Sequence, residues 1–147
     1  MQEAIRQAAL AAQADEVPVG AVIVIEKRII AKAHNQVELL KDPTAHAEMI
    51  AITQATNALG QKWLNECQMY VTLEPCAMCA GAMILARLKT LYFGAYDPKT
   101  GAVGSVTNVL ELEKLNHRVE YTGGIQQDVC GGMLSEFFLK KRGKIAS

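Results

Sequence analysis

Two cysteines stand three residues apart directly behind a proline, in the stretch TLEPCAMC at residues 72–79. On a helix, Cys76 and Cys79 would share one face, and the N–H groups and dipole at the helix start favour thiolate over thiol. Two thiolates make half of a tetrahedral zinc site. On its own, the pair is equally compatible with buried thiols or a redox couple, so the rest of the chain has to decide.

A third candidate ligand lies in the stretch TAHAEM at residues 44–49. His46 is predicted to open a helix, as Cys76 does, and both helices follow loops that leave buried strands. In open α/β sheets such helix starts gather at one edge of the sheet, where ligands bind. A lone histidine there is more often a cap or a hydrogen-bonded surface residue. Beside a pair of cysteines it is better interpreted as a metal ligand.

Glu48 follows His46 by two residues, which on an ideal helix directs the two side chains roughly 200° apart. They address one site only from the first turn, where side chains splay around the helix end. This position suits a carboxylate that serves a metal-bound water without binding the metal. The alternative is a charge that only complements the helix N-terminus.

The two remaining cysteines do not complete a four-ligand site. Cys67 lies at the far end of a predicted strand, about 20 Å from Cys76 at roughly 3.3 Å per residue. Cys130 falls in the apolar stripe of the last predicted helix. Both are expected to be buried thiols. Three protein ligands leave a fourth position for water, which is typical of a catalytic zinc site.

Hydrophobic periodicity predicts the elements that position these residues. Apolar spacing indicates a helix at the start of the chain, one over residues 47–58, one over 76–87 and one from Cys130 onward. Short β-branched or alternating runs indicate strands at 20–25, 28–33, 68–73, 90–95 and 118–122. The first two strands pair as a hairpin. The third and fourth, joined by the helix between them, form a β-α-β unit with parallel strands.

Two helices carry more specific expectations. The helix over residues 47–58 should be capped by Asp42 or Thr44 and end at Gly60. The helix over residues 76–87 is apolar almost all round, so it should be covered on every side. With no linker and no internal repeat, the prediction is a single α/β layer sandwich over residues 1–147.

Composition limits the class of protein. Half of the 147 residues are hydrophobic, a fifth are charged and the formal net charge is zero, as in a globular domain. Neither a membrane span nor a secretory signal is apparent, so a cytoplasmic location with reduced cysteines is the expectation. A local basic patch is still available near the C-terminus, although a solvated helix end explains these charges equally well: Lys140, Lys141, Arg142 and Lys144.

H-x-E followed by P-C-x-x-C is the signature of zinc-dependent nucleoside and nucleobase deaminases. From about residue 16 to 142 the chain resembles, more closely, the bacterial tRNA-specific adenosine deaminases. The metal motif alone is shared with guanine and cytosine deaminases. The segments GAYDPKTGAVGS and NHRVE…LSEFF are what resemble the tRNA enzymes.

This resemblance implies a cytidine deaminase-like fold, a three-layer α/β/α sandwich with a mixed sheet of about five strands. It also implies a homodimer and one zinc ion per chain, held by His46, Cys76 and Cys79. The implied reaction is hydrolytic deamination of the wobble adenosine of a tRNA anticodon to inosine. Zinc activates the water that attacks C6 of adenine, and Glu48 shuttles the protons.

The resemblance also implies residues that contact the RNA. Asn35 would contact the target nucleoside, although it is otherwise an ordinary turn residue after a strand. Apolar side chains that alone indicate core or turn would shape the base pocket: Val17, Pro18 and Leu73. A loop that is otherwise a simple turn would hold the neighbouring nucleotides through Asp97, Lys99 and Thr100.

Two alternatives stay open at the level of sequence. One is a deaminase of the same superfamily that acts on free guanine or cytosine. The other is a zinc or RNA-binding module without turnover, which the missing fourth ligand and the presence of Glu48 disfavour.

Overall fold

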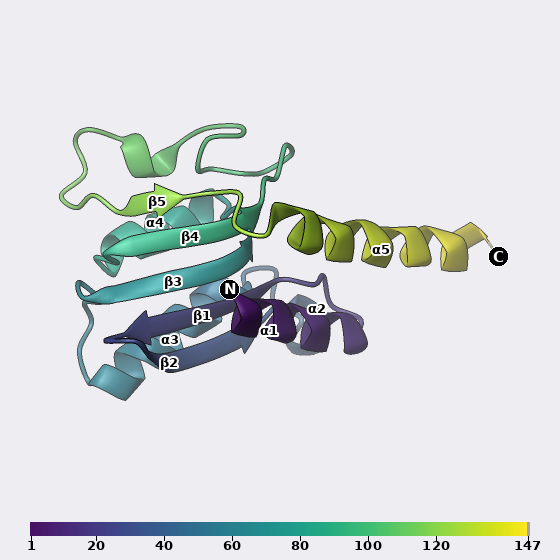
Figure 1. The fold of residues 1–147 in the computed structure, drawn as a ribbon, viewed down its shortest axis with the longest axis horizontal. Helices are drawn as coiled ribbons and strands as arrows, with labels where there is room; N and C mark the ends of the chain where they lie inside the picture. The colour runs from purple at the N-terminus through teal and green to yellow at the C-terminus, as the bar shows by residue number, and fades with distance from the viewer. Residues whose placement is uncertain (147) are drawn as a thin grey trace.

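Five strands form one mixed sheet in the order β2-β1-β3-β4-β5 (Figure 1). The computed structural model describes the backbone of residues 1–146 and the side chains of residues 1–143. The strands are β1 Gly20–Ile25, β2 Arg28–His34, β3 Cys67–Leu73, β4 Thr90–Ala95 and β5 Glu120–Thr122. The strand β1 is antiparallel to β2 and β3, whereas β3, β4 and β5 are parallel to one another. The predicted hairpin and β-α-β unit are confirmed, and the last strand is shorter than expected.

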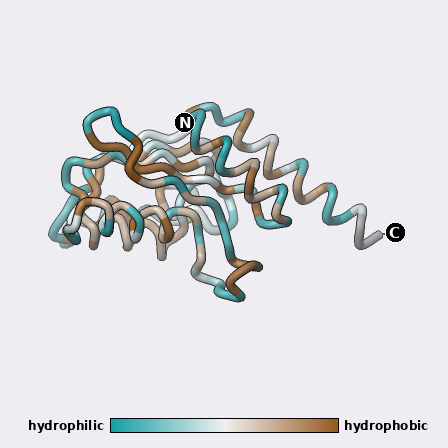
Figure 2. Tube along the Cα trace, turned by 90° about the horizontal axis from the view of Figure 1, so that it is seen from below, coloured by the Kyte–Doolittle hydropathy of each residue, from teal (hydrophilic) through white to brown (hydrophobic). Residues whose placement is uncertain are grey.

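Helices cover both faces of the sheet. The described helices are α1 Gln2–Gln13, α2 Val37–Leu40, α3 Ala47–Leu59, α4 Ala77–Leu85 and α5 Gln127–Ala146, with a 3-10 turn at Val109–Glu111. The helices α1 and α5 lie on one face and α3 and α4 on the other (Figure 1), and the edge-on view in Figure 2 shows the sheet between them. The predicted three-layer α/β/α sandwich is therefore confirmed. Within the described residues, no helix is long and apolar enough to cross a membrane.

Small residues let α3 lie close to the sheet. Ala47, Ala51 and Ala55 recur every four residues and are fully buried, so one face of the helix carries no bulk. Met69 and Ile23 of the sheet are also fully buried and belong to the same apolar core. This packing fixes the start of α3 against the sheet edge, where the candidate ligands lie.

The start of α3 corrects one prediction. The N-cap residue is His46, and neither Asp42 nor Thr44 caps the helix. Asp42 instead accepts hydrogen bonds from the backbone and hydroxyl of Thr44, at 2.8 and 2.7 Å. The first N–H of the helix, on Ala47, donates to Oδ1 of Asn35 at 2.8 Å. The predicted end is confirmed, because Gly60 adopts the left-handed conformation with a φ of 66°.

The helix α4 is less covered than expected. It begins after Cys76 and ends at Leu85, two residues before the predicted end. Cys79, Ala80 and Met83 are buried, but Leu85 is 82% exposed. The prediction of cover on every side is therefore wrong for the single chain.

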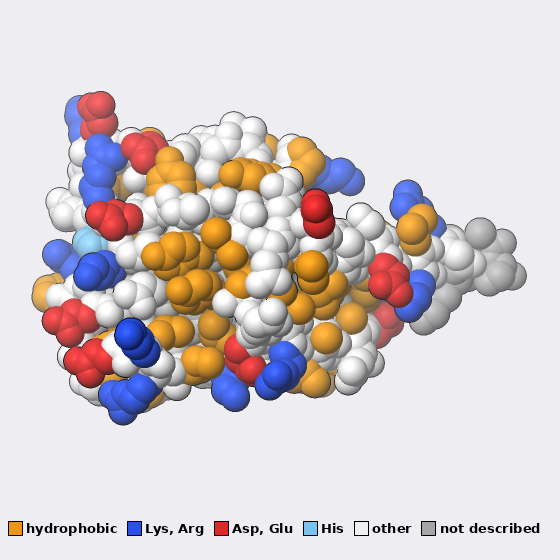
Figure 3. All heavy atoms as spheres, in the orientation of Figure 1, with side chains coloured by type: hydrophobic (Ala, Val, Ile, Leu, Met, Phe, Trp, Pro, Cys, Tyr) orange, Lys and Arg blue, Asp and Glu red, His pale blue; other side chains and the backbone are white. Residues whose placement is uncertain are grey.

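The closing helix α5 projects beyond the sheet (Figure 1). Its start lies directly on β4, since a side chain at Gly94 would collide with the sulfur of Cys130. Further along, Phe138 is 45% exposed, so the predicted apolar stripe is buried only near its beginning. On the side of the molecule that carries α1 and α5, hydrophobic side chains gather over the middle strands and charged ones lie around them (Figure 3).

Candidate metal centre and active site

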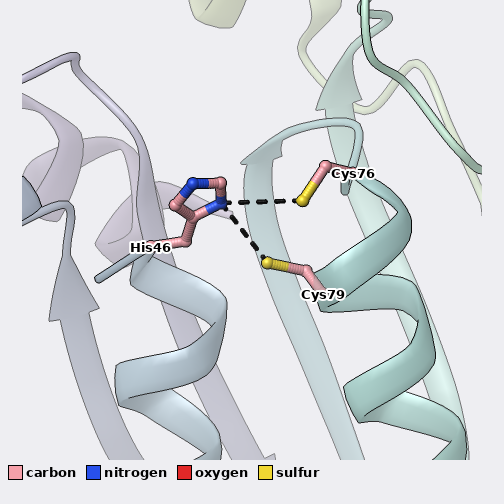
Figure 4. Close-up of side chains that lie close together, drawn as sticks. All are labelled: His46, Cys76 and Cys79. Carbon is pink, nitrogen blue, oxygen red and sulfur yellow. Dashed lines mark hydrogen bonds between the residues drawn. The ribbon is translucent and has the colours of Figure 1, made fainter. Parts of the chain in front are cut away.

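His46, Cys76 and Cys79 come together where α3 and α4 begin, at one edge of the sheet. His46 is the N-cap of α3, and Cys76 is the N-cap of α4. Figure 4 shows one imidazole nitrogen facing both sulfurs, with Nδ1 of His46 3.7 Å from Sγ of Cys76 and 3.5 Å from Sγ of Cys79. Among the described residues, these three form the one group of potential ligands whose donor atoms all lie within 4.8 Å of one another.

The spacing of these donor atoms fits a tetrahedral metal ion. A metal at about 2.05 Å from nitrogen and about 2.3 Å from sulfur, with tetrahedral angles, separates the nitrogen from each sulfur by about 3.6 Å. The two observed separations, 3.7 and 3.5 Å, bracket that value. Both nitrogen–sulfur separations are therefore those of a tetrahedral site, and three protein ligands would leave one coordination position open.

Each of the two thiols shifts the pKa of the other, even without a metal. The thiol of Cys79 donates a hydrogen bond to Cys76, and this bond, helped by His46, lowers the pKa of Cys76 to about 4. The same bond raises the pKa of Cys79. Hydrogen bonding to Cys76 is also the main reason that the pKa of His46 is raised. A thiolate is thus present at neutral pH, as a metal site requires.

Glu48 lies in the first turn of α3 and is only 4% exposed. Its side chain lines the same cavity as His46 and Cys76. Burial is the main reason that the pKa of its carboxyl is raised above the ordinary value. The structure thus brings Glu48 beside the ligands from the first helical turn, as predicted, while its part in proton transfer stays a prediction.

The cavity has a volume of about 450 Å³ and is lined by His46 and Cys76, with Cys79 buried behind them. Five of the residues predicted from the sequence to contact substrate line it: Val17, Asn35, Leu73, Asp97 and Thr100.

Two of the predicted substrate contacts lie elsewhere. Pro18 is fully buried and is not among the residues that line the cavity, so the expected contact between Pro18 and the base has no support from its position. Lys99 lines a neighbouring groove of about 970 Å³ that runs between its loop and α5.

Asn35 has a defined orientation in the cavity. The side chain is 9% exposed, and its oxygen accepts the hydrogen bond from the N–H of Ala47. The backbone N–H of Asn35 donates to the carbonyl of Val19 at 3.1 Å. The oxygen is therefore used by the protein, and the amide NH₂ is the group that can donate to a ligand.

Sequence reasoning missed two buried carboxylates that line the cavity. Glu16 and Glu74 are each 2% exposed. Glu16 accepts hydrogen bonds from the N–H groups of Glu38 and Leu39, at 2.9 and 2.8 Å, and so caps the short helix α2, which was also not predicted. The available signal was an acidic residue beside each of the apolar runs VPVGAV and VTL, since buried carboxylates are rare without partners.

Comparisons with known proteins agree with this geometry. The model of the MafB19-like deaminase family matches residues 1–142. The tRNA-specific adenosine deaminase of Bacillus subtilis (strain 168) is 49% identical, over 99% of this chain and 92% of that protein.

Two solved structures are also similar. One, from a study of A-to-I editing by tRNA:A34 deaminases at the wobble position of transfer RNA, has a TM-score of 0.88 and 42% identity, over 91% of this chain and 97% of that one. A guanine deaminase from Bacillus subtilis has a TM-score of 0.62 and 41% identity, over 65% of this chain and 61% of that one. The family match and the identity over nearly both full lengths show that this chain belongs to the tRNA-specific adenosine deaminases, within the MafB19-like deaminase family.

Proposed function

We propose that this protein hydrolyses the wobble adenosine of a tRNA anticodon to inosine and ammonia, using one zinc ion per chain. The observation that carries the proposal is that three metal-ligand side chains cluster beside a cavity that Glu48, a buried carboxylate, also lines. The names of the similar proteins, which specify adenosine in tRNA, support the choice of substrate.

His46, Cys76 and Cys79 are the residues that would hold the metal. Two cysteines and one histidine are a preferred donor set for zinc, and three protein ligands are typical of catalytic sites. When bound, zinc supplies a nucleophile at neutral pH, because it lowers the pKa of water from 15.7 toward about 7.

Glu48 is the group that would move protons. Burial is the main reason that the pKa of its carboxyl is raised, toward neutral pH. A group whose pKa lies near the working pH both accepts and donates protons efficiently. The carboxylate would take a proton from the attacking water, pass it to the ring nitrogen and then supply the proton that leaves with ammonia.

The cavity would hold one flipped adenine. Val17 and Leu73 supply apolar wall, against which a base stacks or packs. The NH₂ of Asn35 is the donor left to face an acceptor atom of the nucleoside.

The groove beside the cavity would hold the flanking nucleotides. Lys99, Lys141 and Arg142 line it, and Lys141 also lines the cavity itself. Phosphates favour such a local concentration of cations even on a chain without net charge. Lys141 also pairs with Asp15 at 3.3 Å, an exposed ion pair that a phosphate could replace. Lys140 is less suited to this role, because it does not line the groove. The side chain of Lys144 lies outside the described residues.

A homodimer is the assembly that we propose. The support comes from α4, where Ala77 is exposed, Met78 is half-buried and Leu85 is 82% exposed. An apolar helix face of this kind is usually covered by another surface. A second copy of the chain could provide that cover.

The test is a direct comparison of substrates. Zinc-loaded protein is incubated with an anticodon stem-loop carrying adenosine at the wobble position and, separately, with free adenine, guanine and cytosine, and inosine and ammonia are measured. The proposal predicts that the stem-loop is converted and that the free bases are poor substrates. Consumption of free guanine or cytosine with an inert stem-loop would assign the protein to the free-base deaminases. No turnover of any of them would leave a binding module.

A further inference from the structure

We propose that Glu74 is a positioning residue that holds the loop of residues 97–105 in the shape that faces the substrate. The residue directly follows β3 and stands two positions before Cys76. It is 2% exposed, and a buried carboxylate needs compensating partners. The loop supplies all of the partners described below.

Both oxygens of Glu74 accept hydrogen bonds from this loop. Oε1 accepts from the N–H of Asp97 at 2.9 Å and from the hydroxyl of Ser105. Oε2 accepts from the N–H groups of Val103 and Ser105, each at 3.0 Å. Four donors that converge on one carboxylate leave little accepting capacity for anything else. A direct part in proton transfer is therefore not the role that these contacts indicate.

The loop is folded tightly around the carboxylate. At Gly101, a β-carbon would lie 2.4 Å from the carboxyl carbon of Glu74, so a larger residue would displace one of them. The N–H of Ala102 adds a second link, to the carbonyl of Pro75 at 2.8 Å. The loop is thereby attached to the same turn that presents Cys76 to the metal site.

This attachment determines where the substrate-facing side chains lie. Asp97 and Thr100 line the cavity, and the carboxylate of Asp97 accepts hydrogen bonds from the N–H groups of Lys99 and Thr100, at 3.0 and 3.2 Å. Asp97 is itself held by its N–H bond to Glu74. Glu74 therefore acts on the substrate through the loop. This step rests on the proposed function, because the loop is assigned to the nucleotides beside the target.

The decisive variant is Glu74→Gln, which keeps the shape of the side chain but directs an NH₂ group at N–H donors that need an acceptor. Ser105→Ala removes part of the same cluster from an exposed position and cannot disturb the core. Glu111→Gln is the matched control, because Glu111 lies on the following segment and forms an ion pair with exposed Arg118. Each protein is analysed for zinc content, for amide hydrogen exchange by mass spectrometry and for steady-state kinetics on the stem-loop.

We expect Glu74→Gln to speed exchange in peptides that cover residues 97–105 and to leave zinc content unchanged. The Michaelis constant for the stem-loop should rise by about tenfold or more with little change in kcat, because a mispositioned loop loses binding in ground and transition state alike. Ser105→Ala should show smaller changes in the same direction, and Glu111→Gln none.

Two results would overturn the proposal. Exchange in residues 97–105 that matches the parent would show that Glu74 does not hold the loop. A loss of kcat with an unchanged Michaelis constant would place Glu74 in the chemistry instead. If the parent itself leaves the stem-loop unchanged, the proposed function fails, and the exchange measurement alone still decides whether Glu74 holds the loop.

Discussion

Glu48 is a buried carboxylate that lines the same cavity as His46 and Cys76. Replacement by glutamine keeps its size and removes its ability to accept a proton. We predict that Glu48→Gln keeps zinc and stem-loop affinity but loses turnover by about 10²–10⁴-fold, the contribution typical of a general acid–base. Single-turnover rates and elemental analysis check this. A rate near that of the parent would reduce Glu48 to a charge at a helix end.

The same replacement should stabilise the metal-free protein. Because burial raises the pKa of Glu48 above its ordinary value of 4.5, ionising the carboxyl costs the folded state free energy above that pH. Without this cost, the variant should melt at a higher temperature than the metal-free parent at about pH 7.5. The difference should shrink as the pH falls, and vanish below about 4.5, where glutamate becomes protonated in both the folded and the unfolded state. A lower melting temperature for the variant at about pH 7.5 would contradict the assignment of a buried charge.

The cysteines offer a matched pair for the metal site. Cys79 is a potential ligand on α4. Cys67 is equally buried but begins β3, at the end of the strand away from the potential ligands. We predict that Cys79→Ser loses zinc and that Cys67→Ser keeps about one zinc per chain. Elemental analysis after extensive dialysis measures both. Full zinc in the Cys79→Ser protein would rule out the assigned ligand set.

At this scale the sequence predicted the metal ligands because their spacing on helix starts is itself the signal. The roles of Asn35 as a helix cap and of Glu74 as an acceptor for a distant loop carry no such local pattern. Each depends on hydrogen bonds between residues that are 12 or more positions apart. Such partners become visible only once the sheet has brought the loops together.

At the scale of elements, the strands and the larger helices were predictable because each carries a local signal, either an apolar period or a continuous apolar run between polar turns. The predicted cap of α3 was wrong because the N–H of Ala47 donates to Asn35, a residue from another loop. The short helix α2 was missed for the same reason, since its start is capped by Glu16 from across the cavity. Short elements that depend on tertiary contacts give little periodic signal.

The exposed face of α4 makes the assembly testable. Leu85 is 82% exposed on that helix, while Leu39 of α2 is 71% exposed elsewhere. We predict that the parent sediments as a dimer and that Leu85→Glu sediments as a monomer, because a charge is costly in an apolar interface. Leu39→Glu should remain dimeric. A parent protein that sediments as a monomer, or a Leu85→Glu variant that remains dimeric, would place the interface elsewhere or remove it.

At the scale of the whole molecule, net charge predicts nothing about RNA, and the local arrangement of cations has to carry the affinity. Lys141 and Arg142 line the groove, and Lys140 does not. Both lysines form an exposed ion pair, Lys141 with Asp15 and Lys140 with Glu136, so position is what distinguishes them. We predict that replacing Lys141 and Arg142 by alanine weakens binding of the stem-loop and lowers its dependence on salt by about 0.7 in logarithmic slope per lost phosphate contact. Lys140→Ala is the control and should change the slope little. Equal slopes for the parent and the double variant would remove the groove from the RNA site.

One adenosine, at the wobble position of the anticodon, is the proposed substrate. The most direct measurement compares two stem-loops of identical composition, one with its adenosine at the wobble position and one with that adenosine moved to the next position of the loop. Inosine is then located by sequencing and the released ammonia is counted. We expect inosine at the wobble position of the first RNA, with one ammonia per inosine, and little conversion of the second. Equal conversion of both RNAs, or of neither, would contradict this expectation.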